Sequence, residues 1–182
     1  EKASTNLALQ SEDFTTTWVT NFATVVANAA VAPDGTTTMD RVAVTINDAN
    51  HGIYQQSTIT SGANYTASVY IKDDGAGFGG INLGGNVGIS VVADLSTGLV
   101  TDTKAGVGAA IVASGCDDVG NGIYRVWVSG SLASTVGYVI PFLSNAAVPT
   151  LWSNGRPSYI GVLGEDILVW GAQAELGTYP TS

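Results

Sequence analysis

The 182-residue chain has few charged residues, and most of them are acidic. Asp, Glu, Lys and Arg together make up 12% of the residues, against about a quarter in an average soluble domain. Six basic residues oppose fifteen acidic ones, which gives a formal net charge of −9. An acidic surface repels phosphate backbones and anionic lipid headgroups. We therefore expect no nucleic-acid partner and no docking on an anionic membrane, whereas neutral glycans and cations are compatible partners.

Cysteine and histidine are almost absent, and long apolar runs are missing. Cys116 is the only cysteine, so no disulfide can form within the chain. His51 is the only histidine, so a zinc site built from His and Cys lacks ligands, and a catalytic triad would depend on this one residue. No apolar run approaches the roughly 20 residues that a membrane-spanning helix needs, so we expect no membrane insertion.

Apolar and polar residues alternate along most of the chain, and no long stretch has the 3.6-residue period of a helix. In YTASVYIK, for example, Tyr65, Ala67, Val69 and Ile71 share one face, and Tyr70 lies on the other. In YRVWVSGSL, Arg125 and Trp127 likewise alternate with apolar neighbours. Alternation of this kind predicts half-buried strands at 41–46, 53–59, 65–72, 79–85, 89–95, 124–132, 135–143 and 165–176.

Turn-forming residues separate these runs at intervals of roughly ten residues, the spacing of β-sandwiches and barrels. They include Pro33-Asp34-Gly35, Asp73-Asp74-Gly75, Ser96-Thr97-Gly98 and Asn121-Gly122. The segment DLSTGLV predicts a two-stranded ribbon with Ser-Thr-Gly at its tip. No linker-like segment interrupts the pattern. The sequence therefore predicts one all-β domain over 1–182, built as a two-sheet antiparallel β-sandwich.

Three polar loops have two interpretations each, because their oxygen-bearing residues suit either a turn or a calcium ion. In DDVGNG, Asp117 and Asn121 fit part of a calcium loop, but Val119 stands at the middle ligand position. Asn-Gly favours a hairpin turn, because both central residues of that turn need positive φ. The loops NDANHG (47–52), which contains His51, and KDDGAG (72–77) are predicted to be solvated.

Six blocks of the sequence resemble, in order, those of a jelly-roll domain common in virion proteins of tailed phages. Three positions differ from the residues usual in that family: Ile123 stands where Trp is usual, and Ala8 and Ala174 stand where Leu is usual. The blocks are NLALQSEDFTTTW (6–18), APDGTTTMDRV (32–42), YTASVYIK (65–72), DLSTGLV (94–100), DVGNGIYRVWVSG (118–130) and VWGAQAELGTYPTS (169–182).

The resemblance implies a jelly-roll fold similar to carbohydrate-binding modules and concanavalin-like sandwiches. It also implies a virion-surface or extracellular location, in a tail fibre, a tail spike or a head decoration. Family members often continue with YIPT, so Ser182 can be a cut end of a longer chain. In folds of this kind a calcium ion is sometimes bound where the first and last strands meet. Glu12, Asp13 and Asp166 are the positions that match such a calcium site.

Aromatic residues on polar strand faces are candidates for sugar binding. A pyranose stacks its C–H face on an aromatic ring, and its hydroxyls bind amide, carboxylate or guanidinium groups. Each of these residues also has a structural interpretation, as a ring packed under a loop or against a neighbouring subunit. The strand-face candidates are Tyr54, Tyr70, Arg125 and Trp127, and the loop LWSNGRPSY adds Trp152, Asn154, Arg156 and Tyr159.

Features of hydrolytic enzymes are scarce. The chain has no Gly-x-Ser-x-Gly elbow and no ladder of acidic residues at alternate strand positions, and GAGFGG (75–80) is followed by no predicted helix. We therefore predict a non-catalytic module that binds polysaccharide or a cell-surface glycan. Its other expected partners are virion proteins and further copies of the same chain, in a homotrimer. Two alternatives remain: a purely structural capsid or tail subunit, and an accessory module of a polysaccharide-degrading enzyme.

Overall fold

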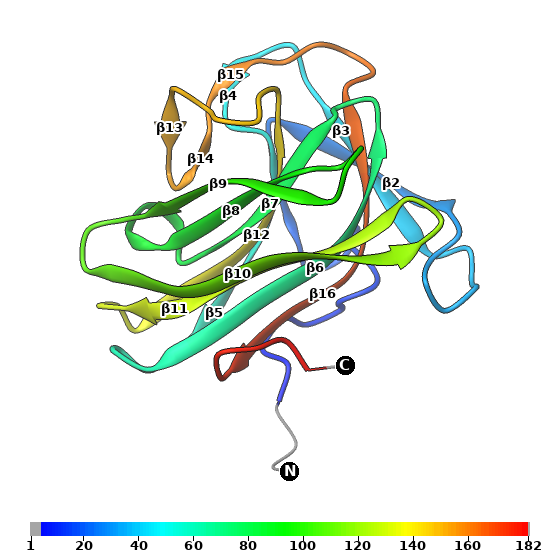
Figure 1. The fold of residues 1–182 in the computed structure, drawn as a ribbon. Helices are drawn as coiled ribbons and strands as arrows, with labels where there is room; N and C mark the ends of the chain where they lie inside the picture. Colours follow the sequence, from blue (N-terminus) through cyan, green and yellow to red (C-terminus); the bar gives the residue numbers. More distant parts are fainter. Residues whose placement is uncertain (1–4, 182) are drawn as a thin grey trace.

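The computed structural model describes residues 5–181 and shows two six-stranded antiparallel sheets packed face to face (Figure 1). The strand order is β1-β5-β12-β7-β8-β9 in one sheet, called sheet A below, and β10-β11-β6-β16-β3-β2 in the other, called sheet B. The predicted two-sheet antiparallel β-sandwich is thus confirmed. Ser182, the last residue of the closing block, lies outside the described residues.

Sheet A is formed mainly by segments whose alternation predicted strands. Strand β12, from the second half of the chain, lies between β5 and β7, so it is distant in sequence from both of its neighbours in the sheet. The strands are β1 (Val19–Asn21), β5 (Gly52–Thr58), β7 (Phe78–Leu83), β8 (Ile89–Asp94), β9 (Leu99–Ala105) and β12 (Val136–Ser144).

Sheet B contains the longest strands, and its centre is formed by β6 between β11 and β16. Leu7 N–H donates to Ala174 O, so the start of the described chain runs beside β16 near the end (Figure 1). The strands are β2 (Ala23–Ala30), β3 (Met39–Val44), β6 (Asn64–Asp74), β10 (Ala109–Gly120), β11 (Ile123–Leu132) and β16 (Asp166–Leu176).

The main core lies between the two sheets and is built by period-two alternation. The predicted inner face of β6, which carries Tyr65, Ala67, Val69 and Ile71, is buried in this core, as expected. Sheet A contributes Ile53, Leu83, Val91 and Val139 among others. Burying side chains of this size stabilises the fold by about 1.5–3 kcal/mol each.

The turns predicted from Asn-Gly and Ser-Thr-Gly are confirmed. Asn121 (φ 60°) and Gly122 (φ 73°) both adopt positive φ between β10 and β11, so the DDVGNG segment ends in a hairpin turn. Ser96-Thr97-Gly98 connects β8 and β9, and Asp94 Oδ1 accepts the Ser96 N–H at 2.8 Å. Positive φ at non-Gly positions is costly, which is why Asn and Gly occupy such turns.

Three details of the prediction are wrong. The strand predicted at 41–46 extends too far, because β3 ends at Val44 and Ile46 is 69% exposed. His51, placed in a solvated loop, is fully buried, and both ring nitrogens lie near backbone oxygens, Nδ1 2.7 Å from Phe22 O and Nε2 3.1 Å from Tyr159 O. Strands β2 and β10 were not predicted, because β2 (ATVVANAA) has two adjacent valines among alanines and bulges interrupt the alternation of β10.

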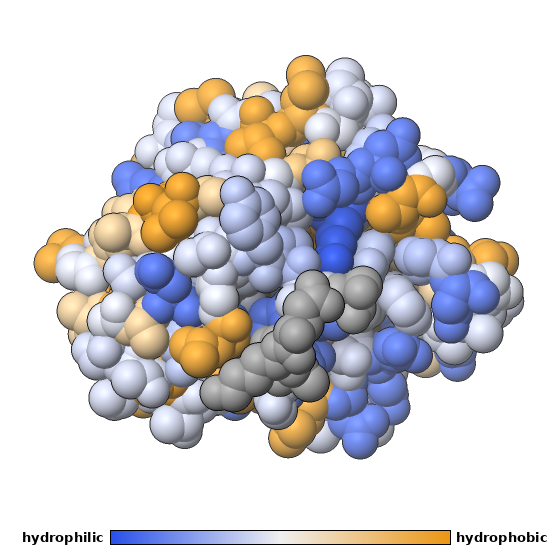
Figure 2. Space-filling model, turned by 60° about the horizontal axis from the view of Figure 1, so that its bottom comes forward, coloured by the Kyte–Doolittle hydropathy of each residue, from blue (hydrophilic) through white to orange (hydrophobic). Residues whose placement is uncertain are grey.

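Short elements at one end of the sandwich cover part of sheet A (Figure 1). The face shown in Figure 2 carries its apolar residues in separate small groups among polar ones. Among the described residues, no helix is long and apolar enough to cross a membrane. The short elements are β4 (Asp48–Ala49), the 3-10 helix η1 (Gly85–Val87), β13 (Trp152–Ser153), β14 (Arg156–Pro157) and β15 (Tyr159–Ile160).

Candidate functional site

A pocket of about 540 Å³ lies on the outer face of sheet A, and is called the sheet A pocket below. Two half-buried tyrosines, Tyr54 of β5 and Tyr138 of β12, supply its aromatic rings. Their ring centroids are 6.0 Å apart in an edge-to-face arrangement. The remaining lining residues are Asn21, Gln56, Gly84, Gly85, Asn86, Val87, Ile140, Asn154 and Arg156.

The wall of this pocket is a small hairpin formed by β13 and β14, with Asn154-Gly155 at its tip. Ser153 pairs with Arg156, so the tip is a two-residue turn, and Asn154 (φ 50°) and Gly155 (φ 72°) both have positive φ. This second Asn-Gly turn follows the same chemistry as the one at 121–122. It places the side chain of Arg156 directly after the turn, at the pocket.

Polar side chains of sheet A hold the hairpin tip against the sheet. Gly155 O accepts from Ser90 Oγ at 2.6 Å and from Asn82 Nδ2 at 3.3 Å, and both side chains are fully buried. On the other side, Asn50 Nδ2 donates to Ser153 O at 2.9 Å. A Cβ at Gly155 would collide with Gly85 O and with the Asn82 amide, so only glycine permits this approach.

Arg156 is the one charged residue that lines the sheet A pocket, and it is 5% exposed. Its Nε and Nη1 atoms are buried and have no hydrogen-bond partner among residues 5–181. Burial lowers the pKa of Arg156 to about 10, because desolvation disfavours the charged form, and the phenol of Tyr54 opposes this shift. At neutral pH the guanidinium is therefore still protonated.

Three of the eight sugar-binding candidates, Tyr54, Asn154 and Arg156, meet in this pocket. Trp152 lies in the same hairpin but is not a lining residue: its Nε1 donates to Pro149 O at 3.0 Å, and Lys104 Nζ lies 5.8 Å from its ring centroid. Tyr159 is 7% exposed and packs against His51, with ring centroids 4.8 Å apart. The structural interpretation fits Tyr159.

On sheet B, the expected display of Arg125 and Trp127 is wrong. Both side chains point away from the core, as predicted, but the end of the chain packs over them. Arg125 is 9% exposed, and its Nη2 donates to Gln173 Oε1 at 2.6 Å and to Thr181 O. Trp127 is 8% exposed, and its ring lies 5.7 Å from that of Tyr179. The alternation rule describes one sheet and carries no information about a distant segment that covers it.

Tyr70 remains a candidate on the same face. It is half-buried beside Trp170, with ring centroids 5.3 Å apart, and the Arg125 guanidinium lies 5.4 Å from its ring centroid. These contacts anchor the ring on three strands of sheet B. A sugar-binding role for Tyr70 stays a prediction.

Sequence reasoning missed several residues of the sheet A pocket. Tyr138 lies in a segment that was correctly predicted as a strand, but its place opposite Gln56 depends on the pairing of β12 with β5, for which the sequence carries no signal. Asn21 and Asn86 come from a short edge strand and from η1, which the sequence pattern did not reveal. Their place at the pocket depends on strand order, which alternation does not encode.

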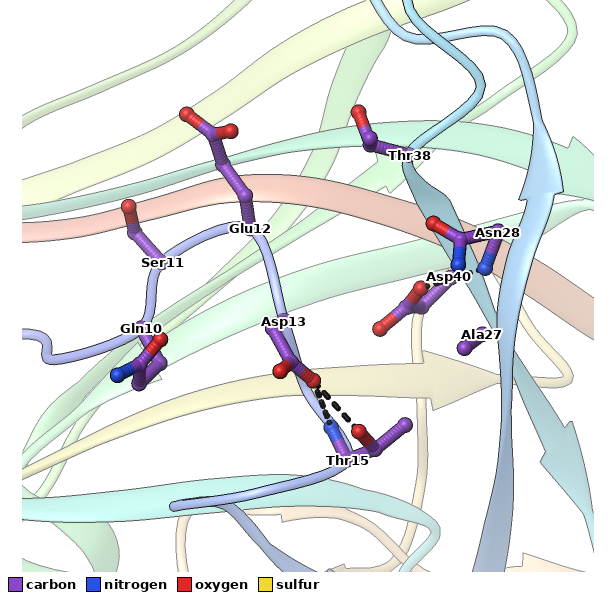
Figure 3. Close-up of a pocket in the computed structure, with 9 residues that line it drawn as sticks. All are labelled: Gln10, Ser11, Glu12, Asp13, Thr15, Ala27, Asn28, Thr38 and Asp40. Carbon is purple, nitrogen blue, oxygen red and sulfur yellow. Dashed lines mark hydrogen bonds between the residues drawn. The ribbon is translucent and has the colours of Figure 1, made fainter.

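A second pocket, of about 570 Å³, is acidic and holds two of the three predicted calcium ligands. Glu12 and Asp13 line it together with Asp40, and Figure 3 shows the Asp13 carboxylate turned towards Thr15. Asp13 Oδ1 accepts from Thr15 Oγ1 at 2.6 Å and from the Thr15 N–H at 2.9 Å. These two bonds lower the pKa of Asp13.

Asp40 of this acidic pocket is buried and already bonded. Its Oδ2 accepts the Phe14 N–H and its Oδ1 accepts the Asn28 N–H, both at 2.9 Å. The third predicted calcium ligand, Asp166, accepts instead from the Val44 N–H at 3.1 Å. Val44 is four residues along β3 from Asp40, a distance of about 13 Å in a strand.

The predicted calcium set is therefore divided between two places: Glu12 and Asp13 lie in the segment before β1, and Asp166 lies at the start of β16 in sheet B. Among the residues that the structure describes, no group of three or more His, Cys, Asp or Glu side chains is arranged to hold a metal ion. Calcium binding stays a prediction that only a binding measurement tests.

No protein-family model and no curated protein sequence matches the chain. Solved structures share the fold at low identity. The tailspike protein 4 enzymatically active domain of bacteriophage CBA120 has a TM-score of 0.51 and 12% identity, and the match covers 94% of this chain and 21% of that one. This similarity supports the β-sandwich fold, and the present chain corresponds to about a fifth of that protein.

Two carbohydrate-binding structures are also similar. The CBM22-1–GH10 modules of Clostridium thermocellum xylanase 10B, complexed with xylohexaose, match with a TM-score of 0.47 and 15% identity over 91% of this chain and 27% of that one. TmCBM61 in complex with β-1,4-galactotriose matches with a TM-score of 0.49 and 10% identity, over 96% of this chain and all of that one.

Proposed function

We propose that this domain is a non-catalytic carbohydrate-binding module and that it holds its glycan in the sheet A pocket. The observation that carries the proposal is the pairing of Tyr54 and Tyr138 inside a pocket of about 540 Å³. This volume falls within the range of about 300–1,000 Å³ that is typical of small-molecule sites. The two rings offer apolar faces to pyranose C–H groups.

Amide groups complete a site suited to sugar hydroxyls. Asn21, Gln56, Asn86 and Asn154 line the same pocket, and each amide offers both a donor and an acceptor. Among the described residues that line the pocket, none is Asp, Glu, His or Cys. A glycosidase needs two carboxyl groups about 5–10 Å apart, so this residue set favours binding over hydrolysis.

The resemblance of the six sequence blocks to phage proteins supports a virion-surface location for this module. Weak single sites suffice on a virion, because many copies multiply the avidity. An accessory module of a polysaccharide-degrading enzyme would use the same pocket, and the gene that encodes the full protein distinguishes the two.

The test is a glycan array followed by titration calorimetry on variants. We expect Tyr54→Ala and Tyr138→Ala each to weaken glycan binding about tenfold, which corresponds to about 1.4 kcal/mol. Tyr179→Ala is the matched control, because Tyr179 is 68% exposed and lies on sheet B. An array that stayed blank, with calcium and with multivalent protein included, would contradict the proposal, as would equal affinities for all three variants.

A structural role is the second candidate, and exposed apolar residues favour it. Val148, Leu151 and Ile160 are 63–66% exposed and line a common pocket of about 360 Å³ near β13 and β15. Val162 and Leu163 continue this apolar surface along the chain. Light scattering after size exclusion tests it: a stable trimer that Leu151→Asp dissociates favours a subunit interface, and a monomer argues against one.

A further inference from the structure

The sheet A pocket and the acidic pocket, both formed by the residues that the structure describes, have opposite charge. Glu12, Asp13 and Asp40 line the acidic pocket, and no Lys or Arg is among its lining residues. Arg156 is the charged residue of the sheet A pocket, which has no acidic lining residue. In a chain with fifteen acidic and six basic residues, a pocket whose single charge is positive runs against the overall balance.

Arg156 is held at the pocket without a countercharge. Its Nε and Nη1 atoms lack hydrogen-bond partners among residues 5–181, and the residue is 95% buried. The described ion pair of the chain, Arg41 with Asp74, lies on sheet B instead. A buried charge without a partner costs free energy. Because the fold gains no hydrogen bond from these two nitrogens, we attribute the position of Arg156 to the binding of a ligand.

The surrounding bonds fix the backbone that carries this guanidinium. Arg156 directly follows Gly155, whose carbonyl is held by Ser90 and Asn82. Its strand partner Ser153 is held by Asn50. The backbone that carries Arg156 is therefore fixed at the pocket, and a ligand does not have to order it first. Preorganisation of this kind raises affinity because less entropy is lost on binding.

We propose that the sheet A pocket selects a carboxylate-bearing sugar residue, such as a uronic acid, and that Arg156 pairs with its carboxylate. This inference rests on the proposed function. A planar carboxylate matches the guanidinium fork, and the tyrosine rings hold the pyranose beside it. Because Nε and Nη1 are shielded from solvent, the guanidinium plane has to turn for both nitrogens to donate to the ligand.

The net charge of −9 opposes any anion at long range, which gives the proposal a specific salt dependence. The Debye length is about 8 Å at physiological ionic strength, so salt screens the long-range repulsion, but weakens a contact inside the pocket much less. Affinity for the acidic glycan should stay level or rise between low and physiological salt. Non-specific attraction of an anion to surface lysines would instead weaken as the salt concentration rises.

The experiment compares matched glycan pairs. Galacturonate-, glucuronate- and mannuronate-containing oligosaccharides are each titrated beside the same oligosaccharide with its carboxyl groups reduced to alcohols. We expect the wild-type protein to bind at least one acidic form tenfold or more tightly than its reduced partner. Arg156→Gln should abolish this preference, and Arg156→Lys, which keeps the charge but loses the fork, should retain part of it.

Arg41→Gln is the control, because it changes the net charge equally but on sheet B, in an exposed ion pair. It should leave the preference unchanged. Melting curves check that the Arg156 variants are folded, and we expect little change because two of its donor nitrogens make no bond. If Arg156→Gln does not fold, the comparison of wild type with Arg156→Lys carries the test.

The outcomes separate the two proposals. Equal binding of acidic and reduced forms, or a preference that survives Arg156→Gln, overturns the choice of an acidic sugar but leaves glycan binding in place. Binding of neutral glycans alone would likewise overturn the choice of an acidic sugar and leave glycan binding in place. A protein that binds no glycan of either kind overturns the proposed function together with this inference.

Discussion

Replacing Gly155 by alanine is the sharpest perturbation of the candidate site, because the structure contains its own control. Gly155 and Gly122 both follow an asparagine at the tip of a two-residue hairpin, with φ of 72° and 73°. Alanine in this conformation costs about 1–2 kcal/mol at either position. At Gly122 the nearest atom to an added Cβ is Lys72 Cε at 3.9 Å, so no further cost arises there.

At Gly155 the added Cβ would collide with Gly85 O and Asn82 Nδ2, and the hairpin tip must move away from sheet A. The hydrogen bonds from Ser90 and Asn82 to Gly155 O are then lost. Leaving a buried donor without a partner costs about 1–3 kcal/mol. We therefore expect Gly155→Ala to reduce the free energy of unfolding by about 2–5 kcal/mol, and Gly122→Ala by about 1–2 kcal/mol.

Urea denaturation followed by tryptophan fluorescence measures both values, and calorimetry measures glycan affinity on the same samples. Gly155→Ala should also weaken glycan binding, because Asn154 and Arg156 flank the displaced tip. Gly122→Ala should not change the affinity, since its hairpin joins β10 and β11 of sheet B. Equal losses of stability in the two variants, with unchanged affinity in both, would refute the reasoning that the tip is pinned to sheet A.

Three further predictions follow from buried or covered groups. Burial raises the pKa of Cys116 to about 12, and nearby Asp side chains add to this shift, so at pH 8 its thiol should react with Ellman's reagent about 10³-fold more slowly in the folded than in the urea-unfolded protein. Because the pKa in the folded state is the higher one, this group should also lower stability as pH rises from about 9 to 12, which urea titrations at several pH values would show. Asp40→Ala leaves two backbone N–H groups without acceptors and should cost about 2–4 kcal/mol in chemical denaturation without changing affinity at the sheet A pocket. Tyr179→Ala should uncover the ring of Trp127 and increase its quenching by acrylamide, and unchanged quenching would mean that other groups cover the ring.

Much of the fold could be predicted, because strands and turns depend on local chemistry. The alternation in YTASVYIK predicted both the strand β6 and its buried face. The Asn-Gly pair at 121–122 predicted the hairpin between β10 and β11. Strands β2 and β10 escaped because β2 (ATVVANAA) combines two adjacent valines with several alanines, and two bulges interrupt the alternation of β10.

The candidate site was predictable only in part. Tyr54, Asn154 and Arg156 were identified by residue type, since aromatic, amide and guanidinium groups suit sugars. Tyr138 was missed because its place opposite Gln56 depends on the pairing of β12 with β5, two strands about eighty residues apart in sequence. Trp127 was wrongly expected to be displayed because Tyr179, some fifty residues later, lies over it.

The local sequence indicated most of the strands, several of their turns and the apolar side of strands such as β6, because these properties depend on neighbours a few residues away. The tertiary structure alone decided which outward faces stay open. The β13–β14 hairpin walls a pocket on sheet A, while Tyr179 and Thr181 cover Trp127 and Arg125 on the outer face of sheet B. Both outcomes depend on contacts between distant segments, and the period of a strand records only its own two faces.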